Sequence, residues 1–274
     1  LVLGRWTIDL ARQDGDDLTA DLLRRDYRIN AIALTLTPQP QLLDPSGGIA
    51  DLREQRITAI HEQNLLDDPL RLVRALRLSA ELSMTIDQGT LEMIARHRHQ
   101  LPKVAPERIQ AELLKLVQAN NADQAIHLLH SLKLIASWSS DQPQRKLNAS
   151  ALTADEQPLA LPLARLTQLL SDQGMHDLRF SRKQIQRCLR LRAWWNRDQQ
   201  QSVNNLTERE RLKLHEELEE DLPAFILSWP MERQKEWLKR WRDREDKLFH
   251  PSAPLDGRTL QAELGLRPGP RLGK

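Results

Sequence analysis

The chain has 274 residues, of which 40% are hydrophobic and 28% are charged. This length and composition allow a buried core and favour two or three subdomains over one. No apolar run approaches the roughly 20 residues that a membrane-spanning helix needs, so we expect a cytoplasmic protein with no membrane partner. The single cysteine, Cys188, excludes an internal disulfide, and no cysteine and histidine spacing typical of a zinc site occurs.

The formal net charge is only +2, but basic residues cluster at 179–197 and at 233–244. Such stretches can follow phosphates by releasing counterions, or they can be solvated helix faces. Four tryptophans lie in the same two regions: Trp194, Trp195, Trp237 and Trp241. Their helical spacing favours packing in a core over stacking on bases.

Residues 1–11 and 28–43 are aliphatic and β-branched runs separated by a short Asp-rich segment. This pattern predicts a strand, a short helix and a second strand. Because the first run reads as a strand already under way at Leu1, we expect that a preceding segment is missing. Asp-Pro-Ser-Gly-Gly at 44–48 then predicts a turn, since glycine adopts backbone angles that other residues avoid.

After this turn, Leu, Ile and Ala recur at every third or fourth residue, which predicts a helical body. Helix starts are expected at 67–69 and at 105–107, where an acidic cap or a proline suits the first turn. Breaks between later helices are expected at 139–144 and at 158–162, which are polar or proline-rich.

Three blocks in a fixed order carry a family resemblance. They are Arg-Arg-Asp-Tyr-Arg-Ile-Asn-Ala at 24–31, Asp-Pro-Ser-Gly-Gly at 44–48, and Asp-Asp-Pro-Leu-Arg at 67–71 with Arg74 and Arg77. The ordered set resembles the class II nucleotidyltransferases, which comprise CCA-adding enzymes, their CC-adding and A-adding relatives, and bacterial poly(A) polymerases. The blocks match the ribose-binding motif, the head-to-neck hinge and the nucleobase template of that family.

The resemblance implies an α+β fold in which the remnant of an α/β nucleotidyltransferase head precedes a mainly helical neck, body and tail. We place the C-terminal part of the head at 1–58. The neck, with the nucleobase-template helix and RNA-binding helices, is placed at 59–138, and the body and tail at 139–274. In the neck, Glu-Arg-Ile at 107–109 matches the family, and the resemblance makes Arg108 and Lys115 candidates for RNA contact.

The family opens with a Gly-Gly-x-Val-Arg-Asp element and a strand bearing two metal-binding aspartates, and we find no counterpart here. We therefore expect an N-terminally truncated chain that is itself inactive. Asp9 is the candidate for a third catalytic carboxylate that binds Mg²⁺, and a solvent-facing strand aspartate is the alternative.

In phosphoryl transfer, the protein mainly positions groups and neutralises charge. Arg25 can bind phosphate oxygens, Asp26 can accept a hydrogen bond from a ribose hydroxyl, and Asn30 can brace the turn. A purely structural Arg–Asp pair is the alternative. These three residues are the nucleotide-binding candidates of the first block.

In the third block, Asp67, Asp68, Arg71 and Arg74 are the nucleotide-binding candidates. Asp68 and Arg71 are three residues apart, so on a helix they share a face. A carboxylate and a guanidinium match the amine donor and ring-nitrogen acceptor of cytosine and adenine, whereas uracil and guanine present a carbonyl. The alternative is a solvated helix with Asp67 as its cap. The family usually has glutamate at the position of Asp67.

The resemblance thus implies a template-independent enzyme that adds C to the 3′ end of tRNA, with CTP and, alternatively, ATP as substrates and Mg²⁺ as cofactor. The connection 12–20 is shorter than the flexible loop of CCA-adding relatives, which favours addition of CC only. A connection trimmed without functional effect is the alternative. A poly(A) polymerase and a non-catalytic RNA- or protein-binding helical module also stay open.

Overall fold

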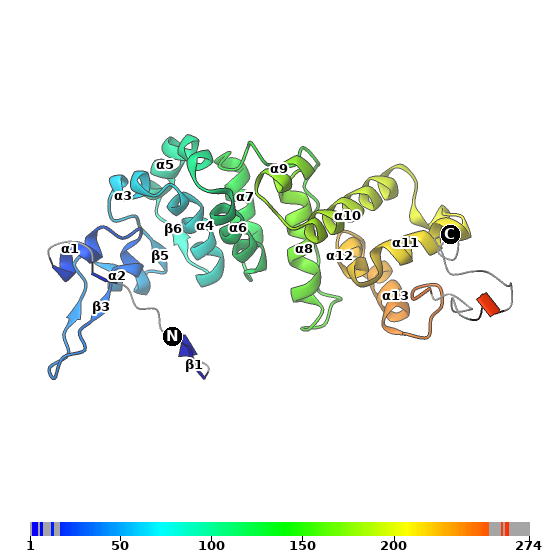
Figure 1. Cartoon of the computed structure of the whole chain (residues 1–274), viewed down its shortest axis with the longest axis horizontal. Coiled ribbons are helices and arrows are strands. Elements are labelled where there is room, and N and C mark those ends of the chain that lie inside the picture. Colours follow the sequence, from blue (N-terminus) through cyan, green and yellow to red (C-terminus); the bar gives the residue numbers. More distant parts are fainter. Residues whose placement is uncertain are drawn as a thin grey trace. The chain divides into compact units, whose positions relative to one another are not determined.

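The computed structural model describes residues 2–4, 6–7, 12–13, 17–251, 259 and 261–262. The chain divides into two compact units. Unit 1 comprises residues 1–144 and 165–185, and unit 2 comprises residues 145–164 and 186–274. Helices dominate both units and the few strands are short, so the expected α+β class is confirmed (Figure 1). Within the described part of the chain, no helix is both long and apolar enough to cross a membrane.

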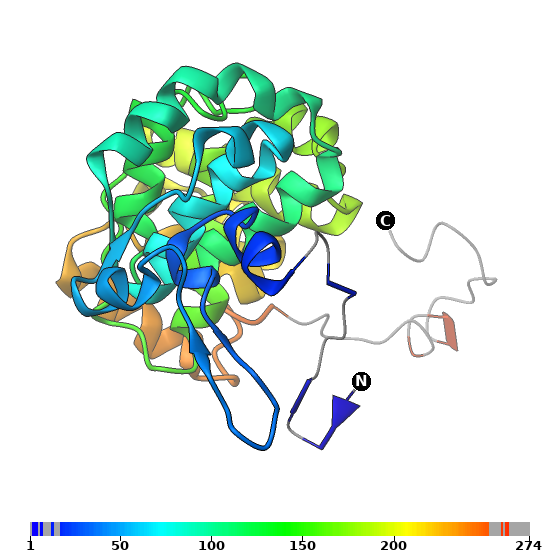
Figure 2. The same ribbon diagram turned by 90° about the vertical axis from the view of Figure 1, so that its left-hand side faces the viewer.

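Unit 1 begins with short strands and short helices. They are β1 (Val2–Leu3), β2 (Trp6–Thr7), α1 (Leu18–Leu23), the 3-10 turn η1 (Arg28–Asn30), β3 (Ala33–Leu34), β4 (Leu42–Leu43) and α2 (Gly48–Arg53). The single strand expected over 28–43 was wrong: η1 precedes an antiparallel hairpin of β3 and β4 that projects from the unit (Figure 2). Pro38 and Pro40 lie at the end of this hairpin, and proline cannot donate to a strand ladder.

The turn predicted at 44–48 is confirmed. The Asp44 carboxylate accepts from the backbone N–H groups of Gly48 at 2.6 Å and Ile49 at 2.9 Å, and so caps α2. Gly47 has a φ of 81°, in the left-handed region. A Cβ on Gly48 would lie 2.1 Å from the carbonyl oxygen of Arg28, so only glycine lets α2 approach η1 this closely.

The rest of unit 1 is a helical core. Its elements are β5 (Arg56–Ile57), α3 (Glu62–Asp67), α4 (Leu70–Leu82), β6 (Thr85–Ile86), α5 (Gln88–His97), η2 (Arg98–Lys103), α6 (Pro106–Gln118), α7 (Ala122–Ser131) and α9 (Asp172–Asp177). β5 and β6 pair in parallel. α4 packs against α6 and α7, with Leu72, Val73 and Leu76 fully buried. The helix start expected at 105–107 is confirmed, because α6 begins at Pro106.

Further helices lead into and build unit 2. They are α8 (Gln157–Leu169), α10 (Arg182–Gln200), η3 (Val203–Asn205), α11 (Glu208–Leu218), η4 (Glu219–Asp221), α12 (Leu222–Ile226) and α13 (Met231–Arg242). The break expected at 139–144 is confirmed, since it lies between α7 and α8. The break expected at 158–162 was wrong. Pro158 lies in the first turn of α8, where its N–H is not needed, and Pro162 removes only the bond to the carbonyl of Pro158.

Aromatic rings fill the core of unit 2. Trp194 and Trp195 are buried, and Trp237 packs edge-to-face on Trp229 with 5.0 Å between ring centroids. Trp241 donates its indole N–H to the carbonyl of Glu219 at 2.8 Å. The expected packing role is confirmed for Trp194, Trp195 and Trp237, whereas Trp241 is partly exposed.

The two basic stretches contain arginines that pair with carboxylates inside unit 2. Arg187 lies 2.6 Å from Asp221, and Arg242 lies 2.6 Å from Glu156. Each pair neutralises a guanidinium that could otherwise meet a phosphate. The arrangement favours ion-paired helix faces over a continuous phosphate-binding stripe.

His215 is expected to make unit 2 sensitive to acid. It is 2% exposed, and its ring lies 4.2 Å from that of Phe249. Burial, assisted by the charge of Arg240, lowers its pKa from 6.5 to about 4. Since an unfolded histidine binds its proton near pH 6.5, stability is lost as the pH falls from there towards 4, by up to about 3 kcal/mol.

Urea unfolding followed by tryptophan fluorescence at about pH 7 and about pH 4.5 measures this loss. The His215→Phe variant keeps a ring in the cluster and removes the titration, so its stability should change much less between the two pH values. An equally steep loss in that variant would assign the acid sensitivity to other groups.

Candidate nucleotide-binding site

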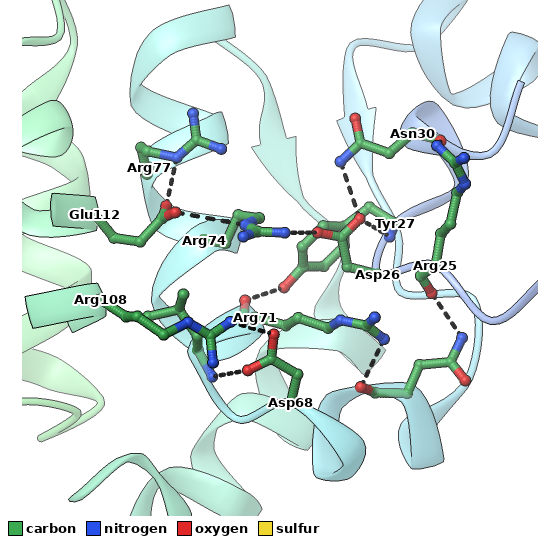
Figure 3. A network of polar contacts seen from close by, with 12 residues as sticks. Arg25, Asp26, Tyr27, Asn30, Asp68, Arg71, Arg74, Arg77, Arg108 and Glu112 are labelled. Carbon is green, nitrogen blue, oxygen red and sulfur yellow. Dashed lines mark hydrogen bonds and ion pairs between the residues drawn. The ribbon is translucent and has the colours of Figure 1, made fainter. Parts of the chain in front are cut away.

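Five of the predicted site residues line a single pocket of unit 1. Its volume is ≈ 290 Å³, and its lining residues are Arg25, Asp26, Asn30, Arg71 and Arg74. Arg25 and Asp26 come from the turn after α1, Asn30 ends η1, and Arg71 and Arg74 come from α4 (Figure 3). The structure therefore brings together side chains from two separate sequence blocks.

Asp26 is the buried acid of this pocket. It is 4% exposed. Its Oδ1 accepts from the backbone N–H of Tyr27 at 2.8 Å and from Nδ2 of Asn30 at 2.9 Å, and its Oδ2 accepts from Nη1 of Arg74 at 3.1 Å. An ionised carboxylate has about four acceptor positions, so about one is left for a ligand hydroxyl.

Arg25 lies at the rim of the pocket and is half exposed. Its Nη2 lies 3.1 Å from Oδ2 of Asp21, and its Nη1 donates to the carbonyl of Asn30 at 3.2 Å. These contacts orient the guanidinium without burying it. A phosphate group can therefore reach it from solvent.

Arg74 joins Asp26 to helix α6. Its Nε lies 3.6 Å from Oε1 of Glu112, an ion-pair distance that is too long for a hydrogen bond. Oε2 of Glu112 in turn accepts from Nε of Arg77 at 2.6 Å. Burial opposes the charge of Arg74, but its pKa is raised because the hydrogen bond to Asp26 and the charges of Asp26, Glu112 and Asp68 outweigh burial. Opposite charges therefore alternate from Asp26 through Arg74 to Glu112 on α6 and on to Arg77 (Figure 3).

Arg71 is held by backbone carbonyls. Its Nη1 donates to the carbonyls of Arg24 at 3.0 Å and Asn64 at 2.8 Å. Asn64 itself donates through Nδ2 to the carbonyls of Leu23 at 2.8 Å and Arg25 at 2.6 Å. The sequence did not single out Asn64, because one asparagine in a short helix has no recognisable pattern. Arg71 keeps donors on Nη2 and Nε that hydrogen-bond to none of the described residues.

Tyr27 fixes the first block to α4. It is fully buried, and its hydroxyl donates to the carbonyl of Arg71 at 2.5 Å. Burial and the neighbouring charge of Asp26 raise the pKa of Tyr27 well above its ordinary value, so the hydroxyl stays protonated and able to donate. Tyr27 was not among the predicted site residues, although it stands inside the first block.

The helix start expected at 67–69 is confirmed, because α4 begins directly after Pro69, but Asp67 and Asp68 are not part of it. α3 ends at Asp67, Asp68 is extended with a φ of −140° and a ψ of 93°, and α4 begins at Leu70. Pro69 explains the break, since a proline disfavours the helical conformation in the residue before it. Asp67 is exposed and accepts from Gln63 at 2.8 Å, so it does not cap α4.

Asp68 therefore does not share a helix face with Arg71, which corrects the geometry expected from their spacing. Its Oδ2 accepts from Nη2 of Arg108 at 2.8 Å, and its Oδ1 makes a long contact of 3.4 Å with the N–H of Leu70. Arg108 comes from α6, and Lys115, two turns further along α6, is exposed. The base-reading role of Asp68 and the RNA contacts of Arg108 and Lys115 remain predictions.

The described residues do not offer Mg²⁺ a site. No group of three or more His, Cys, Asp and Glu side chains among them could hold a metal ion. Asp9, the predicted metal ligand and catalytic acid, lies outside the described residues. In the pocket, Asp26 is the one carboxylate, and three donors already engage it.

Comparison with known proteins gives two family matches. Residues 8–58 match the poly A polymerase head domain, and residues 83–139 match the "probable RNA and SrmB-binding site of polymerase A". A CC-adding tRNA nucleotidyltransferase of Synechocystis sp. is 29% identical over an alignment covering all of this chain and 73% of that protein. A CC-adding tRNA nucleotidyltransferase of Geobacter sulfurreducens is 41% identical over 42% of this chain and 26% of its own length.

Among solved structures, the Bacillus stearothermophilus CCA-adding enzyme in complex with CTP matches with a TM-score of 0.67 at 22% identity. The match covers 93% of this chain and 67% of that one. It shows the same fold.

This chain belongs to the class II tRNA nucleotidyltransferase and poly(A) polymerase family. Asp26 lies in the segment that matches the family head, and Arg108 and Glu112 lie in the segment that matches the RNA-binding region. Arg71 and Arg74 fall between the two matched segments. The domain boundaries predicted at 58 and 138 remain predictions, and residues 1–144 lie within one compact unit.

The variant Asp26→Asn is expected to lower the free energy of unfolding by about 2 kcal/mol. It removes the negative charge from a buried position and leaves the half-buried guanidinium of Arg74 with only the longer ion pair to Glu112. Urea unfolding followed by circular dichroism checks this value. Asp67→Asn, which changes an exposed aspartate outside the pocket, is the matched control and should cost less than about 0.5 kcal/mol. Equal losses of unfolding free energy in Asp26→Asn and Asp67→Asn would contradict the stabilising role of the buried Asp26 charge.

Proposed function

We propose that this chain belongs to an enzyme that adds C to the 3′ end of tRNA without a template. The observation that carries the proposal is the pocket in which Arg25, Asp26, Asn30, Arg71 and Arg74 meet. It combines guanidinium groups with one buried carboxylate, which suits a nucleotide. The names of the relatives support the reaction, because they are CC-adding and CCA-adding enzymes.

In this proposal, Arg25 at the rim binds phosphate oxygens of CTP. Asp26 accepts from a ribose hydroxyl with the acceptor position that its three donors leave. Asn30 keeps the Asp26 carboxylate oriented through its bond to Oδ1. Arg74 neutralises the carboxylate from the other side.

The base would be read by Arg71 and Asp68. Arg71 has unused donors at the pocket for the ring nitrogen of cytosine, and Oδ1 of Asp68 makes only a long contact with Leu70 that an exocyclic amine can replace. Uracil would place a carbonyl against the carboxylate and leave polar groups unpaired, which disfavours it. Asp67 is exposed. In this proposal it takes part in base reading only as the residue next to Asp68.

The RNA would be held by the neck, with Arg108 and Lys115 on α6 as contacts. The family resemblance adds a cytoplasmic location, and Mg²⁺ would supply charge neutralisation at the transferred phosphate. The expectation that residues 1–274 alone are inactive stays part of this proposal.

Replacing Arg71 with alanine is expected to reduce the preference for CTP over UTP about tenfold while leaving tRNA affinity within about twofold. Titration calorimetry with both nucleotides and a filter-binding assay with tRNA measure these quantities. Arg53→Ala removes an exposed arginine at the end of α2, outside the pocket, and serves as control. An unchanged nucleotide preference together with weakened tRNA binding would make Arg71 a phosphate contact instead.

The gene product that carries this chain is expected to add two cytidines to a tRNA lacking CCA and then to stop, even with ATP present. Of the nine residues of the 12–20 connection, 18–20 belong to α1, so the six residues before the helix span at most about 20 Å when extended and have little length left for a loop that reaches another site. Products resolved at single-nucleotide length test this. A terminal A added after CC would show a CCA-adding enzyme, and long A tails on arbitrary RNA would favour the poly(A) polymerase alternative.

A further inference from the structure

Helix α6 reaches the pocket through a carboxylate that does not line it. Glu112 is 6% exposed, and its two oxygens face two guanidinium groups of α4. Oε2 accepts from Nε of Arg77 at 2.6 Å, and Oε1 lies 3.6 Å from Nε of Arg74. A buried carboxylate needs such partners, so Glu112 cannot turn away from α4 without losing them.

Arg74 is in contact with carboxylates on two of its edges. Asp26 accepts from its Nη1 at 3.1 Å, and Glu112 faces its Nε. A free arginine side chain populates many rotamers, and a hydrogen bond at Nη1 together with an ion pair 3.6 Å from the buried Nε favours one orientation. The position of the guanidinium that faces Asp26 therefore depends on a residue outside the pocket.

We propose that Glu112 is a positioning residue of the nucleotide pocket: it orients Arg74 and, through Arg74, the acceptor position of Asp26 that a ribose hydroxyl would use. The inference rests on the proposed function, because the ligand concerned is the nucleotide. Glu112 lies one turn after Arg108 on the helix expected to touch RNA. The same helix thus carries a contact to Asp68 and a contact to Arg74 (Figure 3).

The competing explanation is that Glu112 stabilises the fold through Arg77 alone. Glu81 offers a matched control, because its carboxylate also pairs with Arg77 and contacts no pocket residue among those described. If CTP affinity depends on Glu112 only through the stability that Arg77 provides, Glu81→Gln should weaken CTP binding as Glu112→Gln does. If it depends on Glu112 through Arg74, only Glu112→Gln should weaken CTP binding.

The experiment measures CTP affinity of the chain by titration calorimetry. Glu112→Gln is expected to raise the Kd about tenfold, and Glu81→Gln to leave it within about twofold. The double variant with Arg74→Gln should bind no more weakly than Arg74→Gln alone, because both changes act on one contact. Kd values of Glu112→Gln within about twofold of the unaltered chain, or additive losses in the double variant, would overturn the proposal.

A second measurement does not depend on CTP. Hydrogen exchange of the Tyr27 and Asn30 amides should be about threefold or more faster in Glu112→Gln than in Glu81→Gln, because the turn loses an anchor at Asp26. Arg74→Lys, which keeps the charge and removes the Nε edge, should show the same acceleration if Glu112→Gln does not fold. Absence of CTP binding by the unaltered chain would refute the proposed function, and equal exchange rates in Glu112→Gln and Glu81→Gln would refute the positioning role.

Discussion

The charge of Asp26, buried at 4% exposure, is the constraint on which the pocket depends. A carboxylate removed from water has to be surrounded by donors, and this one recruits a backbone N–H, an asparagine amide and a guanidinium. The guanidinium of Arg74 is itself half buried, which brings Glu112 and then Arg77 into the chain of charges. The turn after α1, helix α4 and helix α6 are tied together by this one sequence of pairings.

Backbone contacts of η1 and α2 also hold the first sequence block of the pocket in place. The turn of the first block leads directly into η1, and α2 approaches η1 so closely that no side chain fits at Gly48. Asp44 fixes the start of α2 through two backbone N–H groups. The pocket is thus built on short, tightly bonded turns instead of on a large sheet, and this explains why its residues come in compact sequence blocks.

Those compact blocks are also the reason why the pocket could be predicted from sequence. Arg25, Asp26 and Asn30 are close neighbours in the chain, and Arg71 and Arg74 follow the helical spacing, so two local patterns in a known family order were sufficient. The prediction that Asp68 shares the helix face of Arg71 failed because Pro69 forces the preceding residue out of the helix. Asn64 and Tyr27 were missed because they act through backbone carbonyls, which leave no trace in a side-chain pattern.

Outside the pocket as well, local sequence patterns were predicted better than features that depend on tertiary contacts. Helix periodicity predicted the helical part of the chain correctly, whereas the effect of the prolines was predicted wrongly in both directions. Pro162 did not break α8, and Pro38 and Pro40 marked a hairpin in a run that otherwise reads as one strand. The effect of a proline depends on whether the missing N–H had a partner, and that is decided by tertiary structure.

Tyr27 is the only tyrosine of the chain, whereas five of the seven tryptophans lie at 194–241 in unit 2. Its hydroxyl is buried and bonded to the carbonyl of Arg71 at the pocket. The chain therefore carries a natural optical label at one defined point: phenol absorption and tyrosine-specific Raman or ultraviolet difference bands arise from a single residue. Changes in these bands report on the junction between the head turn and α4, while tryptophan emission reports mainly on unit 2, so the two regions can be observed separately in the unlabelled protein.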